Sequence, residues 1–148
     1  MDIKTQLTES MKDAMKSGDE VRKRTTRMAL ANIKQAEVDK QATLDDAAII
    51  SLLQKEIKNR REAVEEAKKA NRADLIADNE AEIKVIELFL PKAMPPEELR
   101  ALAQTAIAEV GAAAPSDMGK VMKVLLPKVA GRAAGDQVSA MVKELLVK

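Results

Sequence analysis

The residues best suited to chemistry lie between Asp117 and Gly135, in the stretch DMGKVMKVLLPKVAGRAAG. It contains a Gly-Lys pair, and such a pair at the start of a helix can hold phosphate groups. A Walker A loop has the pattern G-x-x-x-x-G-K-[ST], but here Ala114 replaces the first glycine and Val121 replaces the hydroxyl residue. The sequence therefore argues against a site for nucleotide hydrolysis.

The same stretch could instead meet an extended polyanion. A helix that starts at Ser116 would present free N–H groups and the positive end of its dipole, and we interpret Gly119 as a small residue that permits close helix packing. The basic residues of this segment are Lys120, Lys123, Lys128 and Arg132. The simpler interpretation, a helix-loop-helix corner with ordinary solvated lysines, stays open.

A second basic segment, RKRTTR, occupies residues 22–27. Its candidate phosphate contacts are Arg22, Lys23 and Arg27, because cations without intervening acids can contact several phosphates along a backbone. The alternative is a solvated flank that pairs with acidic residues of a neighbouring helical hairpin. The acids considered for that role are Glu62, Glu65 and Glu66.

The composition excludes several kinds of enzyme. The chain has no cysteine and no histidine, so thiol nucleophiles, thiolate zinc sites and imidazole general bases are excluded. Neighbouring carboxylates such as Glu65-Glu66 and Glu97-Glu98 diverge by about 100° on a helix, and we interpret them as solvated surface groups. We predict no catalytic residue, no metal and no cofactor.

Hydropathy argues against a membrane protein. No run of eighteen apolar residues occurs, and the first residues, MDIKTQLTESMK, lack the apolar region of a secretory signal. We therefore expect no membrane contact and a cytoplasmic location.

The spacing of apolar residues predicts an all-α, multihelical fold. The hydrophobic residues are almost entirely Ala, Leu, Ile, Val and Met, with Phe89 as the only aromatic, which favours helix over sheet. Asp19 is a predicted N-cap, and Thr43 with Asp46 resembles a capping box. The expected helices span residues 3–16, 19–40, 43–70, 75–90, 96–110, 117–126 and 136–147.

The third and fourth of these helices are expected to form a long antiparallel hairpin. Ile50, Leu53, Ile57 and Val64 mark the apolar stripe of the third helix. Arg61 falls close to this stripe, where it would need a carboxylate or a bound phosphate as its partner.

Prolines and glycines mark the predicted boundaries. PKAMPP, beginning at Pro91, separates an N-terminal helical subdomain (1–92) from a C-terminal three-helix bundle (95–148). Within the bundle, Pro127 is expected to break or kink the middle helix, and Gly131 and Gly135 to bracket the loop that follows it.

Four stretches carry a resemblance to a known family. They are MALANIKQAEVDK (28–40), QKEIKNRREAVEEAKKANRADL (54–75), EIKVIELFLPKAMPPEEL (82–99) and SDMGKVMKVLLPKVAGRAAGDQVSAMVKELL (116–146). In them the chain resembles the YqeY family, small proteins related to the tail domain of the GatB subunit of tRNA-dependent amidotransferases. The resemblance implies an all-helical fold in two parts and a possible contact with tRNA.

The resemblance also bears on activity. Family labels such as carbon–nitrogen ligase with glutamine as amido-N-donor follow from association with the amidotransferase, and whether this chain has any activity of its own stays open. We expect a non-catalytic accessory protein that binds tRNA or another structured RNA. The alternative is a protein-interaction module whose Met118, Met122 and Met141 dock on a protein partner, for instance one of the translation machinery.

Overall fold

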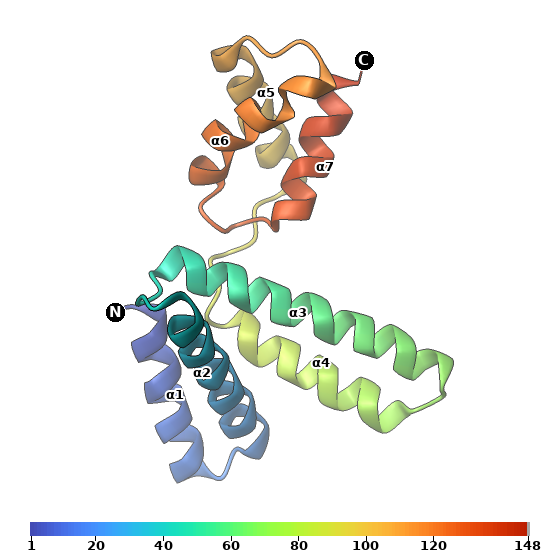
Figure 1. Ribbon diagram of the computed structural model, residues 1–148. Helices are drawn as coiled ribbons and strands as arrows, with labels where there is room; N and C mark the ends of the chain where they lie inside the picture. The colour runs from blue at the N-terminus through green and yellow to red at the C-terminus, as the bar shows by residue number, and fades with distance from the viewer. Residues whose placement is uncertain (148) are drawn as a thin grey trace. The chain divides into compact units, whose positions relative to one another are not determined.

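The structure, a computed structural model, describes residues 1–147 and is all-α (Figure 1). Within this range it contains seven α-helices, one short 3-10 helix and no strand, which confirms the predicted fold class. The α-helices are α1 (Ile3–Ser17), α2 (Glu20–Lys40), α3 (Asp46–Lys69), α4 (Ala73–Glu87), α5 (Pro96–Val110), α6 (Met118–Val129) and α7 (Gly135–Leu146).

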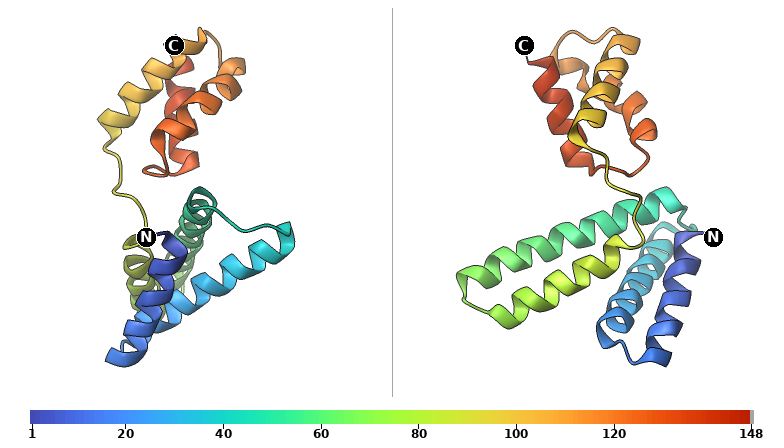
Figure 2. Two further views of the ribbon diagram at one scale, coloured as in Figure 1. Left: turned by 90° about the vertical axis from the view of Figure 1, so that its left-hand side faces the viewer. Right: turned by 180° about the vertical axis from the view of Figure 1, so that it is seen from behind.

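The contacts divide the chain into two compact units between Leu90 and Pro91. The N-terminal unit consists of two antiparallel hairpins, α1–α2 and α3–α4, and α2 packs against α4 (Figure 2). Its core is formed by side chains from all four helices, including Leu7, Ile33, Leu53 and Ile86. The C-terminal unit has a separate core of its own.

Aspartates begin the first three helices. The side chain of Asp19 accepts a hydrogen bond from the backbone N–H of Arg22, which confirms the predicted cap of α2. The predicted cap of α3 at Thr43 is wrong, because Asp45 caps that helix by accepting from the N–H of Ala48 at 2.9 Å. The next residue, Asp46, is occupied elsewhere and accepts from the backbone N–H of Ile3 at 3.2 Å, which joins the starts of α1 and α3.

The apolar stripe of α3 begins one residue earlier than predicted. Ile49 is buried and Ile50 is only partly buried, whereas Leu53, Ile57 and Val64 lie inside as expected. The difference amounts to about 100° at the first residue of the stripe and leaves the other three positions as predicted. It also decides which arginine of α3 becomes buried.

The fourth helix ends at Glu87, before the proline that was expected to stop it. Residues 88–90 form tight turns in which each N–H bonds to the carbonyl three residues earlier, as from Leu90 to Glu87 at 3.2 Å. The residue before a proline disfavours the α conformation, and here this effect extends back over the last turn.

The C-terminal unit is a three-helix bundle of α5, α6 and α7 (Figure 1). Its core includes Ala106, Val121, Leu125, Val138 and Val142, all of them fully buried. Small and branched side chains at helical spacing allow these short helices to pack closely.

The predicted break of α6 at Pro127 is wrong, because Pro127 lies inside the helix, which continues to Val129. Proline removes one backbone donor, so the carbonyl of Lys123 loses its helical partner. Both Pro127 and Lys123 are exposed, and water can satisfy that carbonyl. The helix ends instead at Ala130, whose φ of 51° is left-handed.

Candidate nucleic-acid interface

The start of α6 differs from the predicted phosphate-binding helix terminus. A 3-10 helix (Pro115–Asp117) precedes α6, and no side-chain hydrogen bond of Ser116 caps the helix. Asp117 stands at the N-cap instead, and its Oδ2 accepts from the N–H groups of Ala113 and Ala114 at 3.1 and 3.3 Å. These bonds hold the pKa of the Asp117 carboxyl below its usual range. A negative charge thus already lies where a phosphate was expected.

The three glycines of this region that were assigned structural roles differ in their surroundings. Gly131 has a φ of 77°, a left-handed conformation that favours glycine. Gly119 lies in the first turn of α6 and is exposed, and a Cβ added to it would meet nothing within 4 Å. The interpretation of Gly119 as a close-packing residue is therefore wrong. Gly135, the first residue of α7, also faces open space.

Lys120 and Lys123 are exposed on α6. Val121 and Leu125, which are fully buried, occupy the opposite side of the helix. Within residues 1–147, neither lysine forms an ion pair or a side-chain hydrogen bond. They are therefore available to an anionic ligand without first breaking an internal contact.

Lys128 and Arg132, assigned to the same basic segment, are already occupied. Lys128 Nζ lies 2.8 Å from Glu109 Oε1 on α5. The guanidinium of Arg132 donates two hydrogen bonds to the Glu98 carboxylate, at 2.8 and 3.1 Å, and a third to the carbonyl of Lys92 at 3.2 Å. Charge-assisted bidentate pairs of this kind are among the stronger surface interactions. The structure thus separates the four predicted cations into two free and two paired residues.

Arg132 also holds the start of its unit through its backbone. Its carbonyl accepts from the N–H of Met94 at 2.8 Å, and Met94 is buried in the C-terminal core. The backbone and side chain of Arg132 together fasten residues 92–98 to the loop between α6 and α7. We call this arrangement the Arg132 strap.

The N-terminal basic segment is likewise partly paired. Arg22 lies 3.6 Å from Asp19, and Lys23 lies 3.1 Å from Glu20. Arg27 is exposed and forms no ion pair or side-chain hydrogen bond within the described residues. Pairing with the acidic hairpin does occur, but it joins Arg24 to Glu82 of α4 at 3.0 Å.

The acids considered for that pairing lie elsewhere. Glu65 pairs with Lys68, and Glu66 pairs with Lys69, both within α3. They form exposed pairs three residues apart, which contribute little to stability. The acid of the α3–α4 hairpin that pairs with the basic segment therefore belongs to α4 rather than to α3.

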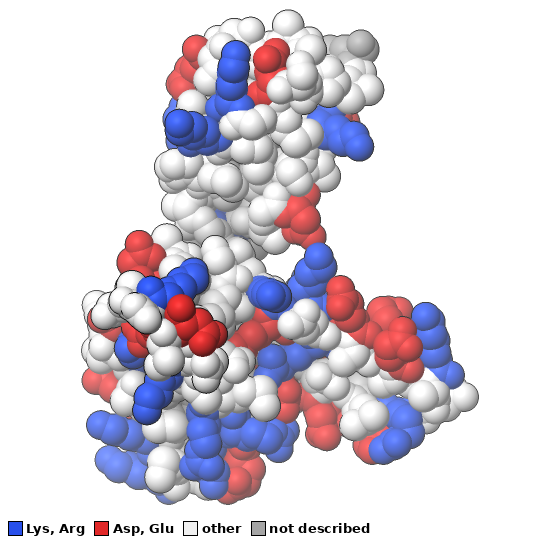
Figure 3. Space-filling view, in the orientation of Figure 1, with Lys and Arg blue, Asp and Glu red and all other residues white. Residues whose placement is uncertain are grey.

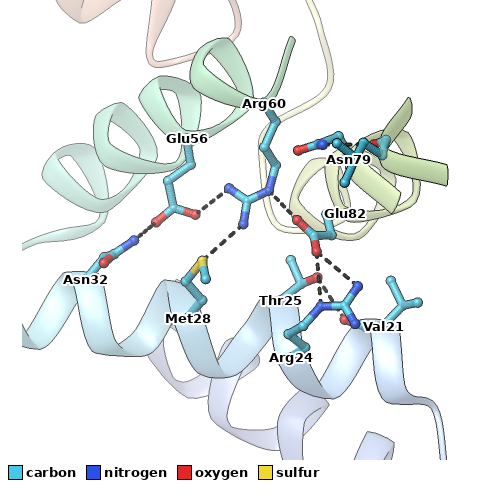
Figure 4. A network of polar contacts seen from close by, with 10 residues as sticks. Val21, Arg24, Thr25, Met28, Asn32, Glu56, Arg60, Asn79 and Glu82 are labelled. Carbon is cyan, nitrogen blue, oxygen red and sulfur yellow. Dashed lines mark hydrogen bonds and ion pairs between the residues drawn. The ribbon is translucent and has the colours of Figure 1, made fainter. Parts of the chain in front are cut away.

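A buried polar network joins α2, α3 and α4 (Figure 4). Arg60 donates from Nε to Glu82 Oε2 at 2.9 Å and from Nη2 to the Met28 sulfur at 3.3 Å, and Nη1 lies 3.5 Å from Glu56 Oε2. The other Glu56 oxygen accepts from the Asn32 side-chain amide at 2.7 Å. The side chains of Arg60 and Glu56 are only 11% and 10% exposed, so each charge depends on its partner.

The sequence interpretation placed Arg61 at this position and missed Arg60. Arg61 is 65% exposed and lies 3.6 Å from Glu87. If the α3 stripe is read from Ile49 instead of Ile50, Glu56 and Arg60 fall within about 20° of Ile49. A helical projection that started at Ile49 could therefore have predicted the buried network.

The methionines considered for a protein-docking surface pack inside the bundle. Met118, Met122 and Met141 are half-buried and contact the C-terminal core. Methionine at helical spacing commonly fills gaps in a core in this way, and their packing does not favour a docking surface.

Among residues 1–147, no group of three acidic side chains could hold a metal ion. In the same range, no helix is long and apolar enough to cross a membrane.

Comparison with known proteins identifies relatives of this chain. The family model described as Yqey-like protein matches residues 4–146. Altered inheritance of mitochondria protein 41, mitochondrial, from Lachancea thermotolerans is 38% identical over 91 residues, which cover 61% of this chain and 49% of that protein. The protein of the same name from Eremothecium gossypii is 32% identical over 113 residues, covering 74% of this chain and 61% of the relative.

An uncharacterized protein of Schizosaccharomyces pombe is 30% identical over 86 residues, covering 58% of this chain and 70% of that protein. The chain spans about half the length of the first of these relatives. Two of the three carry the word mitochondrial in their names, and a cytoplasmic location for this chain stays a prediction.

Proposed function

Because the chain belongs to the YqeY-like family, we propose that it is a non-catalytic accessory protein that binds tRNA or another structured RNA. The observation that carries this proposal is the pair Lys120 and Lys123, which are exposed on α6 and form no ion pair or side-chain hydrogen bond among the described residues. Free cations at the surface release counterions when they meet phosphates, which is the main source of sequence-independent affinity for nucleic acid.

The proposed binding is electrostatic and depends on the shape of the RNA. Proteins that bind single strands stack bases on aromatic side chains, but the only aromatic residue, Phe89, packs against the N-terminal core. The RNA must therefore be held through its backbone, and affinity should fall steeply as salt concentration rises. The proposal assigns to this chain neither a catalytic residue nor the carbon–nitrogen ligase chemistry associated with the family.

The test is fluorescence anisotropy with labelled tRNA at several salt concentrations. We expect the double variant Lys120→Glu/Lys123→Glu to bind more weakly. The slope of log affinity against log salt should also become shallower by about 2, since each lost phosphate contact removes roughly 0.9.

Lys55→Glu/Lys58→Glu is the matched control, because both lysines are exposed on α3 and have no ion-pair partner within the described residues. Equal binding by wild type and the Lys120/Lys123 variant would refute the assigned site. An absence of tRNA binding by wild type at low salt would refute the function.

A further inference from the structure

The α1–α2 hairpin carries a second group of cations, which we call the outer face. Its members are Lys12, Lys16, Lys23, Arg27 and Lys34. All except Lys23 are exposed, and Lys23 alone among them has an ion-pair partner within residues 1–147, Glu20. Figure 3 shows Lys and Arg gathered at the end of this hairpin, where α1 ends and α2 begins, with few acidic side chains between them.

The helical positions of these residues place them on the side away from the core. Ala14 of α1 and Ala29 of α2 are almost fully buried and mark the inward direction of each helix. At about 100° per residue, Lys12 and Lys16 lie roughly 160° from Ala14. The cations of α2 lie roughly 120 to 160° from Ala29 by the same measure.

The contacts of the hairpin show that both helices turn these cations to the same surface. Lys4 Nζ lies 2.7 Å from Glu37 Oε1, so these residues mark the sides on which α1 and α2 meet. The opposite side of α2 faces α3 and α4, through the bonds from Asn32 to Glu56 and from Arg24 to Glu82. The only direction left on both helices is outward, and there the two basic rows run next to each other.

The acidic residues of the hairpin neutralise this surface only in part. Glu9 and Asp13 of α1 are exposed, and Glu9 lies roughly 140° from Ala14, on the outward side. Over residues 3–40, nine Lys and Arg exceed six Asp and Glu by three charges. Glu37 is bound to Lys4 and to the N–H of Leu44, which together hold the pKa of its carboxyl below the usual range. Asp19 caps α2, and Glu20 is held by Lys23.

We propose that the outer face binds the sugar–phosphate backbone of double-helical RNA. From Lys23 to Lys34 the basic row of α2 extends about 16 Å, at 1.5 Å per residue, which is long enough to follow several phosphates. Double-helical RNA is recognised by shape and by contacts to phosphates and 2′-hydroxyls, and such recognition requires no stacking platform. The inference rests on the proposed function in taking RNA as the partner, but it uses a surface of the other unit.

The hairpin is a poor match for an anionic membrane. An interfacial helix inserts its apolar face between lipids, whereas the apolar faces of α1 and α2 are buried in the N-terminal core through Leu7 and Ile33. Only the charges would remain to bind lipid headgroups. Double-helical RNA therefore fits this surface better.

The experiment measures binding of the full chain to a labelled RNA duplex and to a single strand of the same length across a salt series. The test variant is Lys16→Gln/Arg27→Gln/Lys34→Gln, in which none of the replaced side chains has an ion-pair partner among the described residues. The control is Lys55→Gln/Lys58→Gln/Lys84→Gln, which removes three exposed charges from α3 and α4. Circular dichroism of each variant checks that the helices are retained.

We expect wild type and control to bind the duplex more tightly than the single strand. In the test variant, the salt slope for the duplex should fall by about 2 to 3, since three contacts at roughly 0.9 each are lost. An unchanged slope would overturn the inference, as would equal affinity for duplex and single strand. Binding to phosphatidylserine vesicles that depends on the outer face, with no binding to RNA, would overturn it in favour of a membrane partner.

The same assay separates this inference from the proposed function. If the outer-face variant binds RNA like wild type but Lys120→Glu/Lys123→Glu does not, the inference fails and the proposed function stands. If only the outer-face variant loses affinity, the inference stands and the assignment to α6 fails. If wild type binds neither tRNA nor duplex at low salt, both are overturned.

Discussion

At the scale of single residues, the type of a side chain does not decide whether it is available to a ligand. Arg132 and Lys120 are both cations of the C-terminal unit, but Arg132 is held by the Glu98 carboxylate, whereas Lys120 forms no ion pair or side-chain hydrogen bond in the described part of the chain. A phosphate that bound Arg132 would first have to displace this bidentate partner. The free residues are therefore the ones on which binding experiments should concentrate.

Gly119 gives a prediction at this scale. Glycine inside a helix costs about 0.5 to 1 kcal/mol relative to alanine, and a Cβ at this position meets nothing within 4 Å. We expect Gly119→Ala to raise the free energy of unfolding by this amount, measured by urea denaturation.

Gly111→Ala is the matched control for Gly119→Ala. Gly111 also has open space around it, but its φ is +66°, and a left-handed conformation costs a residue with a Cβ about 1 to 2 kcal/mol. This variant should therefore be destabilised. Loss of stability in Gly119→Ala would show that the glycine has a constraint other than packing.

At the scale of helices, the polar network determines how α3 and α4 lie against α2. Glu82 of α4 accepts from both Arg24 of α2 and Arg60 of α3, so one carboxylate joins three helices. Apolar packing is not directional, whereas these hydrogen bonds hold only in one register of the helices. We interpret the network as a device that fixes this register within the N-terminal unit.

Replacement of Arg60 tests this interpretation. Arg60→Ala removes the buried ion-pair partner of Glu56 and Glu82. Breaking a buried ion pair in this way lowers the free energy of unfolding by about 3 to 5 kcal/mol. Arg61→Ala removes the same charge one residue later, from an exposed side chain, and should cost no more than about 1 kcal/mol. Thermal unfolding monitored by circular dichroism compares the two, and similar losses would contradict a special role for Arg60.

At the scale of the whole molecule, the chain consists of two units, each with its own core. The first residues of the second unit are held in place by the Arg132 strap, whose bonds reach Lys92, Met94 and Glu98. In the described structure the backbone hydrogen bonds of the turns at residues 88–90 are all local, to carbonyls three residues earlier. The Arg132 strap therefore holds the proline-rich segment against the C-terminal unit.

Limited trypsin digestion tests the strap, because trypsin cleaves after Lys92 only when the local backbone can open. In Arg132→Gln the bidentate bonds to Glu98 and the bond to the Lys92 carbonyl are lost or weakened, and we expect cleavage after Lys92 to accelerate several-fold. Lys128→Gln, which breaks the ion pair with Glu109 on the same unit, should leave that rate unchanged. Mass spectrometry follows the cleavage. Equal cleavage rates in wild type and Arg132→Gln would contradict the stabilising role of the Arg132 strap.

Local patterns in the chain were enough to predict much of the fold. The predicted end of α1 near residue 16, the Asp19 cap of α2 and the span of α5 agree with the structure, because each depends on neighbouring residues and the intrinsic preferences of the backbone. Thr43, Ser116 and Pro127 show where such reasoning fails. Asp45 caps α3 in place of Thr43, and Asp117 stands at the N-cap of α6 in place of Ser116. Pro127 is exposed to solvent and lies inside α6 instead of ending it.

The sequence by itself determined the fold class, the helical periodicity and the presence of two basic segments, since these follow from residue type and spacing. Only the tertiary structure decided which charges are free. Glu82, Glu98 and Glu109 lie 58, 34 and 19 residues from their basic partners, and no local pattern indicates such pairs. Availability of a charge depends on which distant side chain packing brings within about 3 Å of it, and that information arises only when the helices assemble.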